Sequence, residues 1–174
     1  SVARRAGVSH AAPYAHFADK QALVAAISTE GYRELYERLL AASDRFQGDP
    51  LQRLIETSWA YVTFALERTA HFKITFSATV ERADDYPDFV DISRRSLELV
   101  EQIVKACQAD GILAPGPSDV MTVTVWGLVH GIVSLVLEQQ VPDSVLGQRT
   151  LREALIFALD QITTVPMPHD LAGA

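Results

Sequence analysis

The residues with the clearest chemical potential are basic side chains near the start of the chain. The first twenty positions contain one acid, Asp19, and five residues that can carry positive charge, namely Arg4, Arg5, His10, His16 and Lys20. Guanidinium and ammonium groups bind phosphates, and a basic cluster of this kind is typical of a nucleic-acid contact. With histidine neutral, this segment carries +2 and the remainder −9, since the 174-residue chain carries −7. The distribution favours a small DNA-reading head on an acidic body.

The spacing around Gly7 predicts a helix-turn-helix unit that positions these side chains. Gly7 suits a tight turn between two helices because glycine tolerates positive φ. Ser9 follows the turn and can cap the second helix by accepting from its free backbone N–H groups. Such a unit commonly carries its second helix into the DNA major groove. We therefore expect the start of that helix to face base edges through Ser9, His10 and Ala11.

Apolar residues recur at helical spacing through the rest of the chain, which predicts an all-α fold of about eight helices. Asp19 is placed to cap a long helix that fades near Gly48, and Asp49-Pro50 is a strong start signal for the next. Further helices are expected over about 70–81, 87–110, 118–142 and 145–164. Gly111 is placed to end the helix that precedes it.

These elements suggest three parts. We expect a DNA-binding head with its connecting helix over residues 1–45 and a helical body for ligand binding and dimerisation over 46–165. The last part is a flexible tail over 166–174, where the apolar period stops.

Composition argues against an enzyme. The five histidines are scattered, and none pairs with another His, Cys or carboxylate at the spacing of metal ligands. No glycine-rich loop could cradle a phosphate. The single cysteine, Cys107, cannot form an internal disulfide, so we expect a reducing, cytoplasmic location. The sequence predicts no catalytic residue, no metal and no cofactor.

The segment Val120–Leu137 reaches the lower length limit of a membrane span, with 18 residues and no formal charge. Several polar residues dilute it and no Lys or Arg cluster flanks it, which favours a helix buried in a protein interface. Gly127, Gly131 and Ser134 lie on one face at spacings of four and three. This narrow groove of small residues lets another helix approach closely, so we expect no membrane association.

Three motifs in order resemble the DNA-binding head of the TetR-type transcriptional repressors. They are Ala6-Gly7-Val8-Ser9, then Tyr14-Ala15-His16-Phe17, then Lys20-Gln21-Ala22-Leu23. In the body, the run from Trp126 to His130-Gly131 is similar to a Trp…His-Gly pattern in one branch of that family's effector domain. The resemblance implies a homodimer on an inverted-repeat DNA operator, with a ligand-binding body that changes the spacing of the two heads.

The resemblance also implies roles for particular residues. Tyr14, His16 and Lys20 would hold phosphates, and Arg4 and Arg5 either contact phosphates or remain solvated. The last two long helices, about 118–140 and 145–164, would form the dimer's four-helix bundle. The expected interface residues are Gly127, Gly131, Ser134, Leu151, Leu155 and Leu159. The family's head has a further helix before the turn motif, and we expect that first helix to be absent from this chain.

A mostly apolar pocket is expected among the middle helices, since effector pockets combine aromatic walls with a few polar groups. The candidate lining residues are Trp59, Tyr61, Phe64, Phe72, Phe76, Trp126 and His130. Aromatic residues at helical spacing also pack in cores, and His130 could instead bond across the dimer. The predicted function is a transcriptional regulator of repressor type, controlled by a small apolar or amphipathic effector. The alternative is a TetR-like binding or scaffold protein without DNA binding.

Overall fold

The computed structural model describes residues 16–77 and 80–167. Across these two ranges the fold is helical, with one isolated antiparallel bridge between Leu113 and Thr163. The expected all-α class is therefore confirmed. The elements are α2 (Lys20–Asp44), α3 (Pro50–Glu67), α4 (Thr69–Ser77), the 3-10 helix η2 (Ala83–Asp85), α5 (Pro87–Ala109), α6 (Ser118–Leu137), α7 (Asp143–Leu146) and α8 (Leu151–Asp160).

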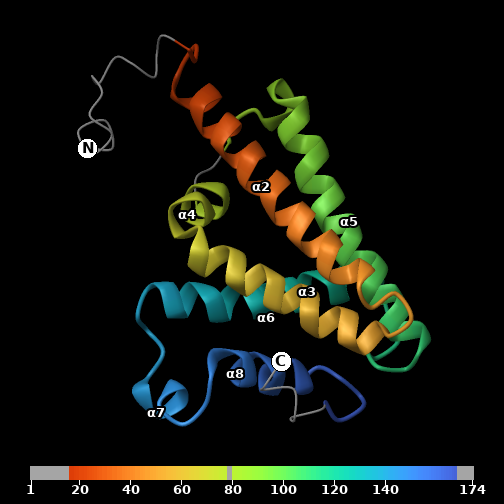
Figure 1. The fold of residues 1–174 in the computed structure, drawn as a ribbon. Coiled ribbons are helices and arrows are strands. Elements are labelled where there is room, and N and C mark those ends of the chain that lie inside the picture. The colour runs from red at the N-terminus through yellow and green to blue at the C-terminus, as the bar shows by residue number, and fades with distance from the viewer. Residues whose placement is uncertain (1–15, 78–79, 168–174) are drawn as a thin grey trace.

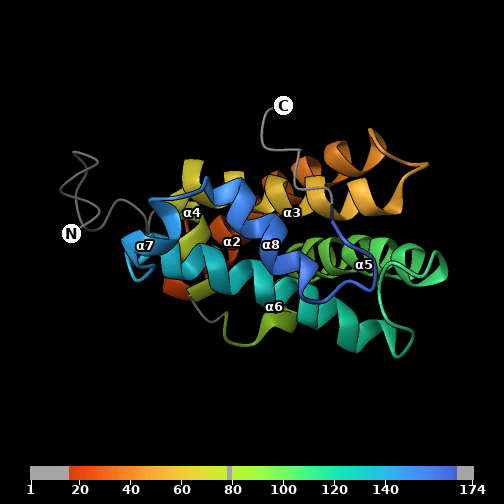
Figure 2. The same ribbon diagram turned by 90° about the horizontal axis from the view of Figure 1, so that it is seen from below.

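The long helices form two groups that meet along α3. Helices α2 and α5 lie side by side and run in the same direction, with the short α4 beside α2 (Figure 1). Helix α3 crosses between this pair and α6, and it contacts α2, α4, α5, α6 and α8. Viewed from below, α6 and α8 occupy the near face of the molecule (Figure 2). Helix α2 is thus held by three neighbouring helices of the body.

Local sequence signals fix several helix ends as expected. The Asp19 carboxylate accepts a hydrogen bond of 2.8 Å from the backbone N–H of Ala22 at the start of α2. Asp49 caps α3 in the same way, with Pro50 at the first helical position. Gly111 follows α5 with a φ of 69°, in the left-handed region that glycine tolerates.

Other helix ends differ from the expectation. Helix α4 is described over Thr69–Ser77, and Val80 is not helical, so the helix does not reach residue 81 as expected. Helix α6 ends at Leu137, before Pro142, because Gln139 adopts a φ of 55°. The expected final helix is two helices, α7 and α8, since Thr150 and Glu153 form a capping box that starts a new helix. Helix α8 ends at Asp160, short of Thr164.

The core lies between α3, α5, α6 and α8. Among its fully buried side chains are Val62, Phe64, Ile103, Val133 and Leu155. Its one thiol belongs to Cys107, which is 0% exposed, donates to the Pro50 carbonyl, and has its pKa raised to about 12 by burial. The apolar stripes of the sequence therefore pack a protomer core before any second chain is considered.

The outer face of α6 is apolar and uncovered. Val120 and Val123 are 61% and 57% exposed, and a Cβ added at Gly127 or Gly131 would meet open space. By length and composition alone α6, with a mean hydropathy of 2.0, could cross a membrane, and 22% of its most apolar window is buried in the protomer. A contiguous apolar surface of this kind is typical of an interaction site, whereas single exposed apolar residues are common and need no explanation.

Helix α8 offers less of a docking face than the sequence predicts. Leu155 and Leu159 are 0% exposed because α8 packs on α3 and α6, so neither has surface left for a partner chain. Leu151 is half-buried, and the exposed apolar residue of this helix is Phe157, at 44%. In the protomer the exposed apolar surface of α8 is therefore on the side of Phe157, and the dimer interface stays a prediction.

Candidate functional site

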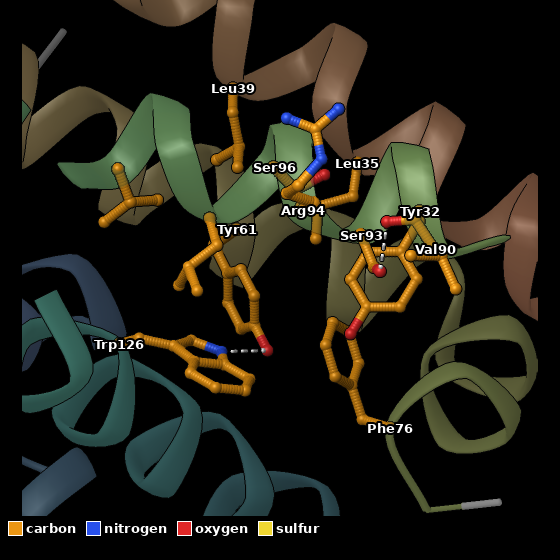
Figure 3. A pocket seen from close by; sticks show the side chains of 12 residues that line it. Tyr32, Leu35, Leu39, Tyr61, Phe76, Val90, Ser93, Arg94, Ser96 and Trp126 are labelled. Carbon is orange, nitrogen blue, oxygen red and sulfur yellow. Dashed lines mark hydrogen bonds between the residues drawn. The ribbon is translucent and has the colours of Figure 1, made fainter. Parts of the chain in front are cut away.

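A cavity of about 380 Å³ lies between α2, α5 and the facing ends of α3, α4 and α6 (Figure 3). Its volume is within the range of small-molecule sites, which are concave and mostly apolar. A second space of about 30 Å³ lies next to it and shares Leu39, Tyr61, Val100 and Trp126 with its wall. The larger cavity is the candidate site.

Helices α2 and α5 supply the two long walls. Tyr32, Leu35 and Leu39 of α2 recur at intervals of three and four and so share one face. The α5 wall is formed by Val90, Ser93, Arg94, Ser96, Leu97 and Val100. Two of these are serines, whose short side chains cannot reach across to α2 as a leucine would. The space is therefore a direct result of small residues on an otherwise apolar helix face.

Three aromatic side chains from different helices close the cavity. Tyr61 of α3, Phe76 of α4 and Trp126 of α6 gather at one side, and Tyr32 of α2 packs edge-on to Phe76 with ring centroids 5.2 Å apart. The ring centroid of Phe76 lies 5.7 Å from that of Tyr61 and 6.4 Å from that of Trp126. Figure 3 shows Tyr61 and Trp126 facing Tyr32 and Phe76 across the space. The wall is thus mostly aromatic π surface.

A short polar chain stands behind this wall. The Tyr61 hydroxyl lies 2.7 Å from Nδ1 of His130 and 3.4 Å from Nε1 of Trp126. The indole N–H can only donate, so the Tyr61 oxygen accepts from it, and the imidazole tautomer sets the direction of the Tyr61–His130 bond. Burial lowers the pKa of His130, which favours the neutral imidazole. Burial also raises the pKa of Tyr61 well above its usual value, so the phenol is neutral as well.

Arg94 is the one charged residue in the cavity wall, and its charge is already balanced. Its guanidinium lies 2.6 Å from carboxylate oxygens of both Asp91 and Glu98 on the same helix. The side chain is 55% exposed. In Figure 3 the guanidinium points away from Trp126 and Phe76. The interior therefore contains no unpaired charge among the described residues.

Of the residues expected to line a pocket, the structure brings Tyr61, Phe76 and Trp126 to the cavity wall. Two more lie directly behind it: the His130 ring centroid is 5.4 Å from Phe76, and that of Phe72 is 4.9 Å from Phe76. Phe64 is fully buried in the core, where its apolar contacts belong to the fold. Trp59 lies apart, beneath the guanidinium of Arg152 at 5.5 Å.

Sequence reasoning missed the α2 and α5 walls. Leu35, Leu39 and Val100 belong to apolar stripes that predict core packing, and nothing local marks them as lining a space. The available signal was the pair Ser93 and Ser96, which interrupts the apolar face of α5 with two small residues. Tyr32 carried no signal of its own, because a tyrosine on a long helix is common at half-buried positions.

Helix α2 touches α4 at a very close contact next to the cavity. A Cβ at Gly31 would clash with Oγ1 of Thr75, so the two helices meet closely there. Gly31 precedes Tyr32, and Thr75 precedes Phe76, so both cavity aromatics adjoin this contact. Farther along, Arg38 of α2 lies 2.7 Å from Glu67 of α3. The position of α2 is thereby tied to the same helices that form the cavity.

The predicted DNA contacts fall mostly outside the described residues. Arg4, Arg5, Ser9, His10, Ala11 and Tyr14 lie in the segment 1–15, of which the structure gives no description. His16 and Lys20 are described, and both are exposed. Lys20 is the first residue of α2, at the end of that helix farthest from the turn to α3. Its ammonium group is therefore accessible to a partner.

Comparison with known proteins shows which family the chain matches. Residues 54–159, more than half of the chain, match the model of the tetracyclin repressor-like C-terminal domain. Residues 1–27 match the model of the bacterial regulatory proteins of the tetR family. No curated protein matches the sequence significantly.

Two solved structures from Rhodococcus share the fold. A protein with unknown function from Rhodococcus sp. RHA1 is 29% identical with a TM-score of 0.72, over 92% of this chain and 79% of that one. A bacterial regulatory protein in the tetR family from Rhodococcus RHA1 is 21% identical with a TM-score of 0.69, over 92% and 83%. The matched models and the helical fold agree. The chain therefore belongs to the tetR family of bacterial regulatory proteins, and it is a transcriptional regulator.

Proposed function

We propose that this regulator is a ligand-responsive repressor, which binds an inverted-repeat operator as a homodimer in the cytoplasm and takes a small, mostly apolar effector into the cavity. One observation carries the proposal: a wall of the cavity is made by α2. This helix begins at Lys20, with the last of the three motifs that resemble a DNA-binding head. A molecule in the cavity therefore contacts the element that joins the DNA-binding and effector-binding parts.

The proposed switch is a shift between two populations of head spacing. Two heads that read adjacent half-sites must lie about 34–36 Å apart, one turn of DNA. A ligand that displaces Tyr32 tilts α2 about its contact with α4, because Gly31 and Thr75 are packed too closely to slide. The effector moves this equilibrium only by its differential affinity for the two states.

The proposed dimer surface is the outer face of α6. Val120, Val123 and Gly127 recur at intervals of three and four and so share that face, which continues to Leu135. Two copies of such a face can approach closely along the small residues Gly127, Gly131 and Ser134. The exposed side of α8 around Leu151 and Phe157 borders the same surface in the proposal, since α8 packs on α6.

The test of this proposal is a mobility shift of the protein on the DNA upstream of its own gene. We expect a retarded complex that is lost when one arm of the inverted repeat is scrambled, and whose affinity falls steeply with added salt. The scrambled duplex of equal length is the control for non-specific binding. Equal affinity for both duplexes, or no complex at low salt, would instead favour a helical binding or scaffold protein without DNA recognition.

A further inference from the structure

The cavity lining indicates the chemical class of the effector, an inference that rests on the proposed effector-binding role. We propose that the cavity takes an uncharged, planar ring compound with a single hydroxyl group, held between aromatic side chains and bonded through that hydroxyl to Tyr61. Three properties of the wall lead to this class: its charge, its π surface and the state of its two phenols.

The charge of the wall argues against an ionic ligand. Arg94 is paired with two carboxylates on the outer side of α5, and the rest of the lining is apolar or neutral. A carboxylate or ammonium group moved into this space loses its hydration and gains no free counter-charge. To use Arg94, an anion would have to displace Asp91 or Glu98, which already lie at 2.6 Å. A neutral molecule incurs neither cost.

The aromatic surface favours a flat ring system. Tyr61, Phe76 and Trp126 come from three helices, and their side chains turn toward the same space as Tyr32 (Figure 3). Aromatic pairs prefer edge-to-face or offset arrangements, which a planar ligand between such walls can adopt with several partners at once. An aliphatic chain would fill the same volume without these pair contacts.

The two phenols of the wall define the polar group of the ligand. The Tyr61 hydroxyl accepts from Trp126 and shares one further hydrogen bond with His130, so one position on it, a lone pair or the proton according to the His130 tautomer, remains for a ligand hydroxyl. Across the described residues the Tyr32 hydroxyl has no hydrogen-bond partner, and it can donate. A ligand hydroxyl both donates and accepts, so it suits this pair better than a carbonyl or an ammonium group does.

The test uses three bicyclic probes of equal shape: 2-naphthol, naphthalene and 2-naphthoate. Each is titrated into the whole protein, with binding followed by tryptophan fluorescence and by the rise in Tm that a ligand of the folded state must cause. We expect 2-naphthol to bind most tightly, naphthalene about 3- to 10-fold more weakly for the loss of one hydrogen bond, and 2-naphthoate at least 10-fold more weakly than 2-naphthol.

Two variants assign the binding to this cavity. Tyr61→Phe should weaken 2-naphthol about 3- to 10-fold and leave naphthalene within twofold, because only the hydrogen bond is lost. Leu97→Trp fills the mouth of the cavity from an exposed position, so it should weaken both neutral probes without disturbing the core. This second variant keeps the test valid if Tyr61→Phe folds poorly.

Arg94→Gln removes the one charge of the wall and so tests whether an anionic probe uses it. Arg33→Gln, which removes an ion-paired arginine of α2 outside the lining, is the matched control and should leave 2-naphthol binding unchanged. Tighter binding of 2-naphthoate that Arg94→Gln abolishes would overturn the inference in favour of an anionic effector, and so would failure of both neutral probes to bind. Either result leaves the operator shift intact, whereas loss of sequence-specific DNA binding contradicts the proposed function itself.

Discussion

Tyr61 is the residue at which the core, the cavity and α6 meet. Its ring packs edge-on to Phe72 with centroids 5.8 Å apart, and its hydroxyl bonds to His130 and Trp126 of α6. A buried polar chain of this kind stabilises one arrangement of its members only while all of them are satisfied. The protonation state of His130 therefore bears on how α3 and α6 fit together.

We predict that His130 makes the folded state sensitive to mild acid. Burial lowers the pKa of His130 in the folded state below its ordinary 6.5, while the unfolded chain keeps the ordinary value. Below about pH 6.5 the unfolded state therefore binds more protons, and stability falls as pH falls toward the lowered folded pKa. Above pH 6.5 this contribution is fully retained.

The measurement is the difference in Tm between wild type and His130→Gln from pH 8 to pH 5. Gln keeps an acceptor for Tyr61 and does not titrate, so the variant should lose less Tm on acidification. The other histidines are the same in both proteins and cancel in the comparison. Parallel curves for the two proteins would show that His130 does not titrate differently on folding.

At the level of single residues, the prediction for DNA contact concerns Lys20. Lys20→Ala should weaken operator binding uniformly across sequences and reduce the slope of log K against log salt by about one, because one phosphate contact is lost. Lys105→Ala is the matched control, since Lys105 is also exposed but lies near the C-terminal end of α5, away from the start of α2. An unchanged slope for Lys20→Ala removes this lysine from the phosphate contacts.

At the scale of helices, the closest packing is between α2 and α4. Gly31 is required there because a larger residue would meet Thr75, and the hydroxyls of Ser28 and Thr75 are buried without hydrogen-bond partners in the described structure. Unsatisfied buried hydroxyls destabilise a contact and are uncommon in folded proteins. The close approach of α2 to α4 next to the cavity therefore leaves two buried hydroxyls unpaired, which lowers the stability of the fold.

We predict that Gly31→Ala destabilises the fold by about 1–2 kcal/mol. The overpacking cost exceeds the gain in helix propensity, because Thr75 is short and β-branched and has little freedom to move aside. Urea unfolding at a fixed protein concentration measures the change. Adding Thr75→Ala should restore wild-type stability or exceed it, since that change removes both the clash and an unpaired hydroxyl. If the double variant is as unstable as Gly31→Ala, the clash is not with Thr75.

The helices themselves were predictable where local chemistry decides them. Asp19, Asp49 and Gly111 mark ends that the structure confirms, because a cap or a positive φ depends only on neighbouring residues. The break between α7 and α8 was missed, since the Thr150–Glu153 capping box interrupts an apolar period that continues across it. The cavity could be predicted only in part: its aromatic members are visible in the sequence, whereas the space between α2 and α5 depends on tertiary packing.

At the scale of the whole molecule, α6 has two different faces: one packs in the protomer core, and the other is the proposed dimer surface. The buried stripe of α6, which includes Val125, Val129 and Val133, packs within the chain. The opposite stripe, with Val123 and Gly127, has no cover in the described protomer. A helix that is apolar all round in a regulator of this family is best explained by a second copy.

We predict that Val123→Asp converts the proposed dimer to a folded monomer of 19.1 kDa. Val123 is 57% exposed, so the charge does little to the protomer but would be buried without a partner in the dimer. Sedimentation measures the mass, and circular dichroism checks the fold. Leu66→Asp, at a position that is 40% exposed on α3, is the matched control and should remain dimeric. A dimeric Val123→Asp protein would place the interface elsewhere.

Because Cys107 is fully buried, the wild-type chain has no reactive thiol that would compete with an introduced label. Its thiol is inaccessible and its pKa is raised to about 12, so maleimide reagents at neutral pH should leave it unmodified. A cysteine introduced at the exposed Ala26 of α2 would then carry the only spin label in each subunit. Pulsed dipolar spectroscopy on that sample would report how far apart the two connecting helices lie, with and without an added compound, in solution.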